Sequence, residues 1–258
     1  MDPILFEIKG SVGCITLNRP NKYNSFTREL ALSMQKALKE CRDNAEVRCI
    51  LITGAGKAFC AGQDLGEVTQ ENGPELSTIL SEHLNPIIRL IREIEKPIVA
   101  AVNGVAAGAG ANVALACDIT VAAPDASFIQ AFTKIGLIPD SGGTFFLPRL
   151  VGIQRAAAYM MLGDKISAQE AVSVGMIYQI LTEDDFLAAA FALAERLAKM
   201  PTRGLGLTKR ALNQAFTNDL DRQLAIEDQL QSFAGQTHDY KEGVAAFMEK
   251  RKPVFKGE

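Results

Sequence analysis

The sequence predicts an α/β fold in which strand pairs alternate with helices, followed by a helical C-terminal region. Two observations predict it. Up to about residue 195, short apolar runs bounded by glycine or proline alternate with stretches of helical spacing, and after that the spacing is mostly helical. We therefore expect residues 1–195 to form a core of sheets covered by helices that carries the functional site. Residues 196–258 are expected to close the pocket or to pack against another subunit.

The first elements are a hairpin, a helix and a buried strand. Residues 4–8 alternate apolar and polar side chains, and residues 13–18 do the same after a glycine turn. Apolar residues fall at helical spacing from Thr27 to Cys41, with Thr27 as the expected N-cap. The apolar run 48–54 then ends at a glycine, which indicates a strand buried on both faces.

A second cycle of the same kind follows. Residues 76–95 have helical spacing that Pro97 ends, 97–102 read as a buried strand, and 118–123 as another. Further on, Ser167 is the expected N-cap of a short helix, with Glu170 in the capping-box position. The helical C-terminal part is broken at Pro201 and near Gly235.

Composition excludes several classes of function. The formal net charge is −3 and no basic stripe is present, which argues against nucleic-acid binding. No apolar run reaches the length of about 18 residues that a membrane span requires, and the first residues carry an acid but no basic segment. These features predict a cytoplasmic protein that binds neither nucleic acid nor membrane.

The cysteines predict neither disulfides nor a metal site. They are scattered, odd in number and form no CxxC pair: Cys14, Cys41, Cys49, Cys60 and Cys117. We expect buried, reduced thiols. A nucleophilic cysteine normally needs a histidine partner, and the chain holds only His83 and His238.

Two loops of small residues each follow a predicted buried strand. Residues 54–65 and 104–112 are rich in glycine and alanine, and the second loop also opens a helix. Small residues let a ligand approach backbone N–H groups, and the start of a helix stabilises negative charge. Taken singly, either loop is equally consistent with a surface turn or with tight helix–sheet packing. Together they favour an oxyanion site built from two backbone N–H donors.

A third segment, residues 136–144, places one carboxylate in an apolar turn before two glycines. Taken alone, Asp140 is best explained as a helix N-cap.

The three segments together resemble the signature regions of the crotonase superfamily, the enoyl-CoA hydratase/isomerase family. They read KAFCAGQDL at 57–65, AVNGVAAGAG at 101–110 and GLIPDSGGT at 136–144, in the family's order and spacing. The resemblance covers essentially the whole chain. It implies a crotonase-like spiral of ββα units with a helical C-terminal region, and trimers that usually pair into hexamers. It also implies an oxyanion hole that grips an acyl-CoA thioester, formed by the backbone N–H groups of Gln63 and Ala109.

The sequence departs from the family's hydratases at two positions. Hydratases carry two glutamates that position water, and those places here hold Asn112 and Phe132. Neither side chain is a general acid or base of the kind that hydration needs. The carboxylate at Asp140 instead matches the catalytic aspartate of the family's isomerases, and apolar neighbours Phe132, Leu137 and Ile138 should strengthen it as a base. Asn112 is a weaker candidate for steering substrate or water.

The segments NGVAAGAGA at 103–111, GLIPD at 136–140 and GLGL at 204–207 most resemble one branch of the family. That branch isomerises ring-1,2-epoxyphenylacetyl-CoA to an oxepin and shifts a 3-enoyl double bond to the 2 position. Coenzyme A enters as part of the substrate, and neither a separate cofactor nor a metal is expected. Its phosphates need cations, and Lys250 would serve across a subunit boundary. The expected contacts with the CoA thioester are Lys22, Lys57, Ala61, Gly62, Asp64, Leu65, Gly108, Phe132 and Lys250.

The position of Asp140 also matches the nucleophilic aspartate of an aryl-CoA dehalogenase in the family, but the sequence shows no well-placed histidine for hydrolysis of the aryl-enzyme. Two other functions stay open. An enoyl-CoA hydratase with an unusual set of water-positioning groups would turn over crotonyl-CoA. A catalytically silent homologue that binds RNA or a protein partner is the alternative from another class, against which the acidic charge balance argues.

Overall fold

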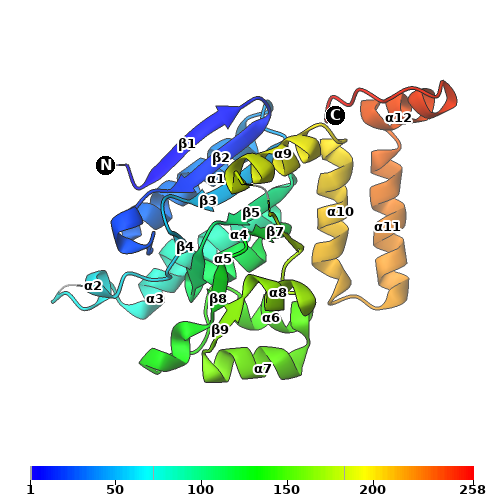
Figure 1. Cartoon of the computed structure of the whole chain (residues 1–258). Helices are drawn as coiled ribbons and strands as arrows, with labels where there is room; N and C mark the ends of the chain where they lie inside the picture. The colour runs from blue at the N-terminus through cyan, green and yellow to red at the C-terminus, as the bar shows by residue number, and fades with distance from the viewer. Residues whose placement is uncertain (1, 72, 183) are drawn as a thin grey trace.

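The chain is built around a sheet of six strands (Figure 1). The structure, a computed structural model, describes residues 2–71, 73–182 and 184–258. In spatial order the strands are β1 (Ile4–Lys9), β2 (Val12–Leu17), β3 (Cys49–Gly54), β5 (Ile98–Val102), β7 (Ile119–Ala122) and β10 (Gln179–Ile180). The pair β1–β2 is the predicted antiparallel hairpin, and the later pairings in this sheet are parallel.

A second sheet of short strands lies beside the first. It consists of β4 (Ala58–Cys60), β6 (Val105–Ala107), β8 (Ser127–Ile129) and β9 (Lys165–Ser167). Along the chain three of the large-sheet strands are each followed by a short strand and then by a helix: β3 by β4, β5 by β6 and β7 by β8. This repetition is the expected succession of ββα units. It delivers the end of each short strand to the same neighbourhood.

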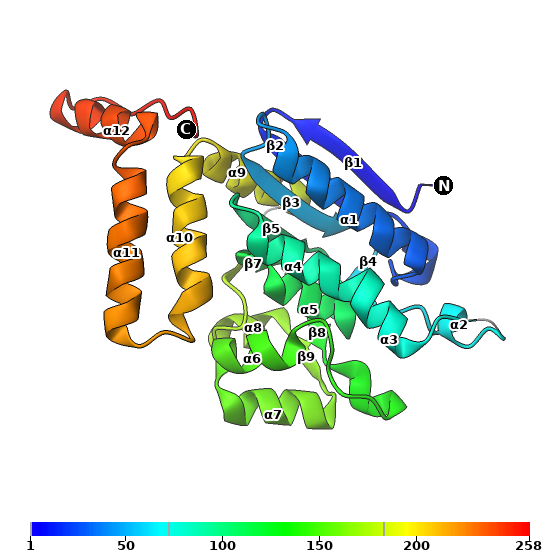
Figure 2. The ribbon, with the colours of Figure 1, turned by 180° about the vertical axis from the view of Figure 1, so that it is seen from behind.

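Helices cover both faces of the large sheet (Figure 2). Ile50 and Ile52 of β3 belong to a core shared with α1 (Arg28–Asp43), α4 (Asn85–Glu93) and α5 (Ala109–Ala116). Cys49 and Leu51 belong to the opposite core, under α9 (Phe186–Ala198). Burial on both faces is why the parallel strands read as continuous apolar runs and not as alternating patterns.

The remaining helical elements are short and lie around the two sheets. They are η1 (Pro20–Lys22), α2 (Leu65–Val68), α3 (Leu76–Thr78), η2 (Ile79–Leu84), η3 (Ala131–Ile135), α6 (Gly143–Val151), α7 (Ile153–Leu162) and α8 (Ala168–Ser173). The helix expected over 76–95 is therefore real but interrupted. Its middle part, η2, is π-helical and leads into α4, which ends at Glu93.

The expected helix caps are confirmed in two cases and corrected in one. Thr27 accepts a hydrogen bond from the Leu30 N–H at 3.3 Å, and Ser167 accepts one from the Glu170 N–H at 3.1 Å. The reciprocal half of the capping box is wrong, because the Glu170 carboxylate accepts instead from the Tyr159 hydroxyl at 2.7 Å. A tyrosine on the neighbouring α7 outcompetes the local backbone partner.

The C-terminal helices project from the core. They are α10 (Thr202–Ala215), α11 (Leu220–Ala234) and α12 (His238–Met248), with the expected breaks at Pro201 and Gly235. Figures 1 and 2 both show α12 at the opposite end of the molecule from α2. In one copy of the chain these helices therefore do not close over the small-residue loops. None of the described helices is long and apolar enough to cross a membrane.

Candidate functional site

The two loops of small residues meet at two glycines. A Cβ atom added to Gly62 would lie 3.5 Å from the Ala109 nitrogen and 3.0 Å from the Ala107 carbonyl oxygen. A Cβ added to Gly108 would lie 3.9 Å from the Gly62 Cα atom. Gly62 has φ +91° and Gly108 has φ +51°, a backbone region that side chains rarely adopt. Glycine at both positions therefore lets the two backbones approach each other.

The Gln63 N–H is left free by the way this loop pairs with Phe26. Phe26 donates to the Gly62 carbonyl at 2.7 Å and accepts from the Asp64 N–H at 2.8 Å. The Gln63 N–H between them has no hydrogen-bond partner in the described part of the chain. The Gln63 side chain instead donates to Glu67 at 3.3 Å.

The Ala109 N–H is free because it begins a helix. Ala109 is the first residue of α5, whose first internal hydrogen bond runs from the Asn112 N–H to the Gly108 carbonyl at 3.1 Å. The preceding N–H, that of Gly108, is used by the Ile129 carbonyl of β8 at 2.9 Å. Two adjacent loops thus each present one donor, at the positive end of a fully buried helix. This arrangement can stabilise an oxyanion.

Phe132 closes one side of these loops. Its ring would lie 3.7 Å from a Cβ at Gly108, and the residue is almost fully buried. The Phe132 ring therefore lies beside Gly108, at a position where the family's hydratases are expected to hold a glutamate. It offers no acid or base.

Asp140 lies between η3 and α6, in a turn with strained backbone. Ser141 and Gly142, the two residues after it, have φ +49° and +75°. The Asp140 carboxylate does not cap α6, whose N-cap is Gly142; it accepts the Ser141 hydroxyl at 2.9 Å. Burial raises the pKa of the Asp140 carboxyl above its ordinary value, and the Ser141 hydrogen bond opposes that rise. The carboxyl is therefore not the cap of α6, and Asp140 is a candidate base.

For two of the three apolar neighbours expected around Asp140, the prediction is wrong. Ile138 is 81% exposed and Leu137 is 36% exposed, so neither is buried against the carboxyl. The turn faces outward here, and Phe132 alone of the three expected side chains is buried.

Asn112 touches the Asp140 turn through its side chain. Its Nδ2 donates to the Asp140 carbonyl at 2.8 Å, and its Oδ1 accepts from Gln130 Nε2 at 2.8 Å. Asn112 and Gln130 are fully buried. Gln130 is not among the site residues that the sequence predicts; the available signal is a polar residue directly after the apolar strand β8. Asn112 is therefore engaged with the protein and is not free to steer water.

The expected CoA contacts fall into two groups. Residues 61–65 lie together at the loop, where the Ala61 N–H donates to the Tyr23 carbonyl at 2.9 Å and Leu65 is exposed. The Asp64 carboxylate caps α2 by accepting from the Gly66 N–H at 3.0 Å, and it pairs with Arg19 at 2.9 Å. Arg19 is a further residue that the sequence reading did not identify.

The candidate cations are separated in space. Lys22 ends η1 and Lys57 lies in the turn between β3 and β4, and both are exposed. Lys250 follows α12 at the far end of the molecule (Figure 1). One copy of the chain therefore cannot bring Lys250 to the loops that hold Lys22 and Lys57.

The cysteines offer no nucleophile. The five thiols are free and buried, and burial raises the pKa of Cys60, the one nearest the loops, to about 12. No group of three or more potential metal ligands occurs among the described residues.

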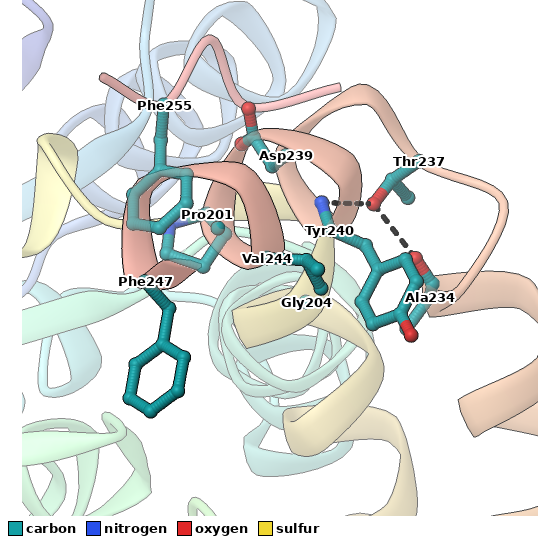
Figure 3. Close-up of a pocket in the computed structure, with 10 residues that line it drawn as sticks. Pro201, Gly204, Ala234, Thr237, Asp239, Tyr240, Val244, Phe247 and Phe255 are labelled. Carbon is teal, nitrogen blue, oxygen red and sulfur yellow. Dashed lines mark hydrogen bonds between the residues drawn. The ribbon is translucent and has the colours of Figure 1, made fainter. Parts of the chain in front are cut away.

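A hollow at the C-terminal helices is a separate feature (Figure 3). It lies between α10 and α12 and is lined mainly by apolar side chains, including Pro201, Val244, Phe247 and Phe255. The one carboxylate among its described lining residues, Asp239, accepts the backbone N–H groups of Lys256 and Gly257 at 2.7 Å each. That carboxylate anchors the C-terminal tail, so the hollow has no group poised for chemistry.

Comparison with known proteins gives a consistent result. The family model described as enoyl-CoA hydratase/isomerase matches residues 7–258. The 1,2-epoxyphenylacetyl-CoA isomerase of Escherichia coli (strain K12) is 45% identical over 260 residues, with 100% of this chain and 99% of that protein covered. A probable enoyl-CoA hydratase of Rhodobacter capsulatus is 44% identical, with 98% of this chain and 98% of that protein covered. The crystal structure of an enoyl-CoA hydratase from Bacillus anthracis superposes with a TM-score of 0.91 at 34% identity, covering 99% of this chain and 100% of that one.

Proposed function

This chain belongs to the enoyl-CoA hydratase/isomerase family, and from that membership we propose that it is an acyl-CoA isomerase in which Asp140 moves the proton. The Gln63 and Ala109 N–H groups would hold the thioester oxygen as it becomes an enolate. In a reaction of this kind the donors matter because charge on that oxygen grows toward the transition state.

One observation carries the proposal: the carboxyl that the site offers is Asp140, and not a pair of glutamates. Asn112 has both ends of its amide engaged within the protein, and Phe132 presents a ring. One base can remove a proton from one carbon and return it to another, whereas hydration needs groups that bind and activate water. The site therefore favours isomerisation.

The proposed reaction balances with Asp140 as the one proton carrier. For a 3-enoyl-CoA, the Asp140 carboxylate takes a proton from C2, and the electron pair spreads to the thioester oxygen as a dienolate. The same carboxyl then returns the proton to C4, which leaves the double bond between C2 and C3. Its raised pKa makes it a stronger base than a solvated aspartate and a carboxyl that holds the proton between the two steps.

The test is turnover of 3-enoyl-CoA and 2-enoyl-CoA side by side, in the wild type and in Asp140→Asn. We expect the wild type to isomerise the first and to hydrate the second slowly or not at all. Asp140→Asn should bind substrate but lose isomerisation, because an amide cannot carry the proton. Asp125→Asn, the same change at an exposed turn between β7 and β8, is the matched control and should keep wild-type turnover.

For the acyl group we propose the ring epoxide of phenylacetyl-CoA, converted to the oxepin, together with the linear 3-enoyl shift. Support comes from the name and 45% identity of the E. coli relative. Turnover of enzymatically generated ring-1,2-epoxyphenylacetyl-CoA, followed by the appearance of the oxepin product, tests this assignment. Activity on linear 3-enoyl-CoA alone would restrict the function to the double-bond shift.

Hydration is the second candidate, because the R. capsulatus relative of 44% identity carries a hydratase name. Fast hydration of crotonyl-CoA that survives Asp140→Asn would move the function to hydratase.

We also propose that Lys22 and Lys57 of one copy and Lys250 of another hold the CoA phosphates, in a trimer or a pair of trimers. Charge-assisted contacts to phosphate are strong, and Lys250 lies too far from the loops of its own copy (Figure 1). Light scattering that shows particles of only 27.8 kDa, the mass of one chain, would exclude this arrangement.

A further inference from the structure

The structure points to a pair of buried amides, Gln130 and Asn112, as positioning residues for Asp140. We infer that Asn112, oriented by Gln130, holds the Asp140 turn in the conformation that aims its carboxylate. This inference rests on the proposed isomerase and assigns to Asn112 a task other than water binding.

The direction of both hydrogen bonds is fixed by chemistry. The Asp140 carbonyl can only accept, so the atom of Asn112 that faces it at 2.8 Å must be the donor Nδ2. The Asn112 Oδ1 then faces Gln130, which must present its own Nε2, also at 2.8 Å. An amide is therefore required at position 112, because it must donate at one end and accept at the other.

The Asp140 carbonyl is held from two sides. Besides Asn112 Nδ2, it accepts the Gly143 N–H at 2.8 Å across the turn. Between Asp140 and Gly143 the backbone passes through left-handed conformations at Ser141 and Gly142. Such strained backbone persists where surrounding contacts over-determine it, and it clusters at functional sites.

The backbone of Gly143 packs closely against the Asn112 side-chain amide. A Cβ atom at Gly143 would overlap the Asn112 side chain. The turn therefore packs its backbone directly on the amide, and a shift of Asn112 would be passed to Asp140 without a flexible side chain between them.

The same helix carries the oxyanion donor. Ala109 and Asn112 lie three residues apart on α5, which is about 4.5 Å along a helix axis. Gln130 follows Ile129, whose carbonyl accepts the Gly108 N–H at 2.9 Å. The pair therefore joins the loop that holds the thioester oxygen to the turn that holds the proton carrier, and sets their separation.

Gln130 Oε1 is buried without a hydrogen-bond partner among the described residues. Leaving a buried acceptor unpaired is costly. Retention of Gln130 despite that cost is consistent with a role for the hydrogen bond that its Nε2 donates to Asn112.

The first test is Asn112→Asp, which keeps the shape but removes the donor and brings a second carboxylate against the Asp140 turn. We expect kcat on 3-enoyl-CoA to fall at least tenfold, with KM changed less than threefold, because Asn112 is fully buried and is not one of the expected CoA contacts. The repulsion between two carboxylates should also move the acid limb of the pH–rate profile upward by about one pH unit. Loss of fold alone would not move that limb.

Gln35→Glu is the matched control. Gln35 is a buried amide, 7% exposed, that donates to the carbonyls of Glu82 and His83 at 2.7 and 2.9 Å. It should lower thermal stability and leave the acid limb where it is. Gln130→Leu is the second variant, since it introduces no charge: kcat should fall while the limb stays in place.

The outcomes separate the two proposals. Wild-type kcat and an unmoved acid limb in Asn112→Asp, or wild-type kcat in Gln130→Leu, would overturn the positioning role while isomerisation and its dependence on Asp140 stand. A wild-type enzyme that does not isomerise at all would instead overturn the proposed function.

Discussion

The oxyanion hole makes a sharp prediction at Gly62, a residue whose side chain is a single hydrogen. In Gly62→Ala the new methyl carbon would lie 3.0 Å from the Ala107 carbonyl oxygen and 3.5 Å from the Ala109 nitrogen. The first distance is tighter than ordinary van der Waals contact, and φ +91° is strained for alanine. The loop must move away from the start of α5, and the Gln63 N–H moves with it.

The expected loss follows from the role of that N–H. Removing one oxyanion donor costs about 3 kcal/mol, or roughly a hundredfold in kcat. Residues 61–65 are also expected CoA contacts, so KM can rise as the loop moves, and the loss of the oxyanion donor is measured by the fall in kcat at saturating substrate. The assay is steady-state turnover of 3-enoyl-CoA, with thermal unfolding of the same preparation.

Gly10→Ala supplies the matched control for backbone strain. Gly10 has φ +56° in the turn between β1 and β2, with no atom within 4 Å of the added Cβ. A left-handed alanine costs about 1–2 kcal/mol, which lowers Tm by about 2–4 °C per kcal/mol in a chain of this size. We expect that loss of stability with unchanged kcat. If Gly62→Ala behaved like Gly10→Ala, with lower Tm but normal kcat, the Gln63 N–H would not be an oxyanion donor.

Three further predictions concern pH, ion pairing and thiols. Burial raises the pKa of Asp140 in the folded chain, so the stabilising contribution of the protonated carboxyl is present below the unfolded pKa and is lost as pH rises through the folded pKa. Asp140→Asn should therefore raise Tm at pH 8. An unchanged or lower Tm would argue against burial of the charge. Asp118 forms ion pairs with Arg92 at 3.0 Å and with the buried Lys209 at 2.8 Å. Asp118→Asn should therefore lower the free energy of unfolding, measured by chemical denaturation, by about 3 kcal/mol. A loss below about 1 kcal/mol would mean that solvent screens these ion pairs. Thiol titration with Ellman's reagent should release colour slowly from the native chain and give 5 equivalents after denaturation; rapid labelling of the native chain would contradict thiol burial.

Five of the six strands of the large sheet carry strong local signals in the sequence, whereas the two-residue strand β10 is too short to show a pattern and is not predicted. The run 49–54 is apolar, buried along its whole length and ended by a glycine, and 98–102 behaves in the same way. These strands were recognised within a residue or two. The short strands β4 and β6 lie in segments that the sequence predicts as loops. Three residues show no period, and alanine-rich segments such as Val105–Ala107 lack the branched side chains that mark strands.

The oxyanion loops could be predicted as a pair, but not their contact. The small residues at 61–62 and 107–109 are visible in the sequence. Their approach depends on the pairing of β4 with β6, which joins residues more than 45 positions apart. The local pattern predicts that a ligand can reach the backbone of each loop, but only the tertiary structure shows that the two loops lie next to each other.

The relation between Asn112 and Asp140 lay beyond sequence reading for a similar reason. The hydrogen bonds join residues 18 and 28 positions apart, and an asparagine on a helix shows no sign of its partner. The exposure of Ile138 was equally hidden, because an apolar residue in a loop does not reveal whether another surface covers it.

The hydrogen bond from Asn112 to the Asp140 turn also explains why a carboxylate at position 112, as expected in a hydratase, should be incompatible with the present conformation of that turn. An ionised carboxylate at position 112 would present an acceptor to the Asp140 carbonyl, in place of the donor that now lies 2.8 Å from it. It would also place negative charge beside the Asp140 carboxyl, whose charged form burial already disfavours. A longer glutamate would further crowd Gly143, which has no room even for its own Cβ against the present amide. Converting this site to hydration therefore requires the Asp140 turn to change together with position 112, and Asn112→Glu alone should give neither activity.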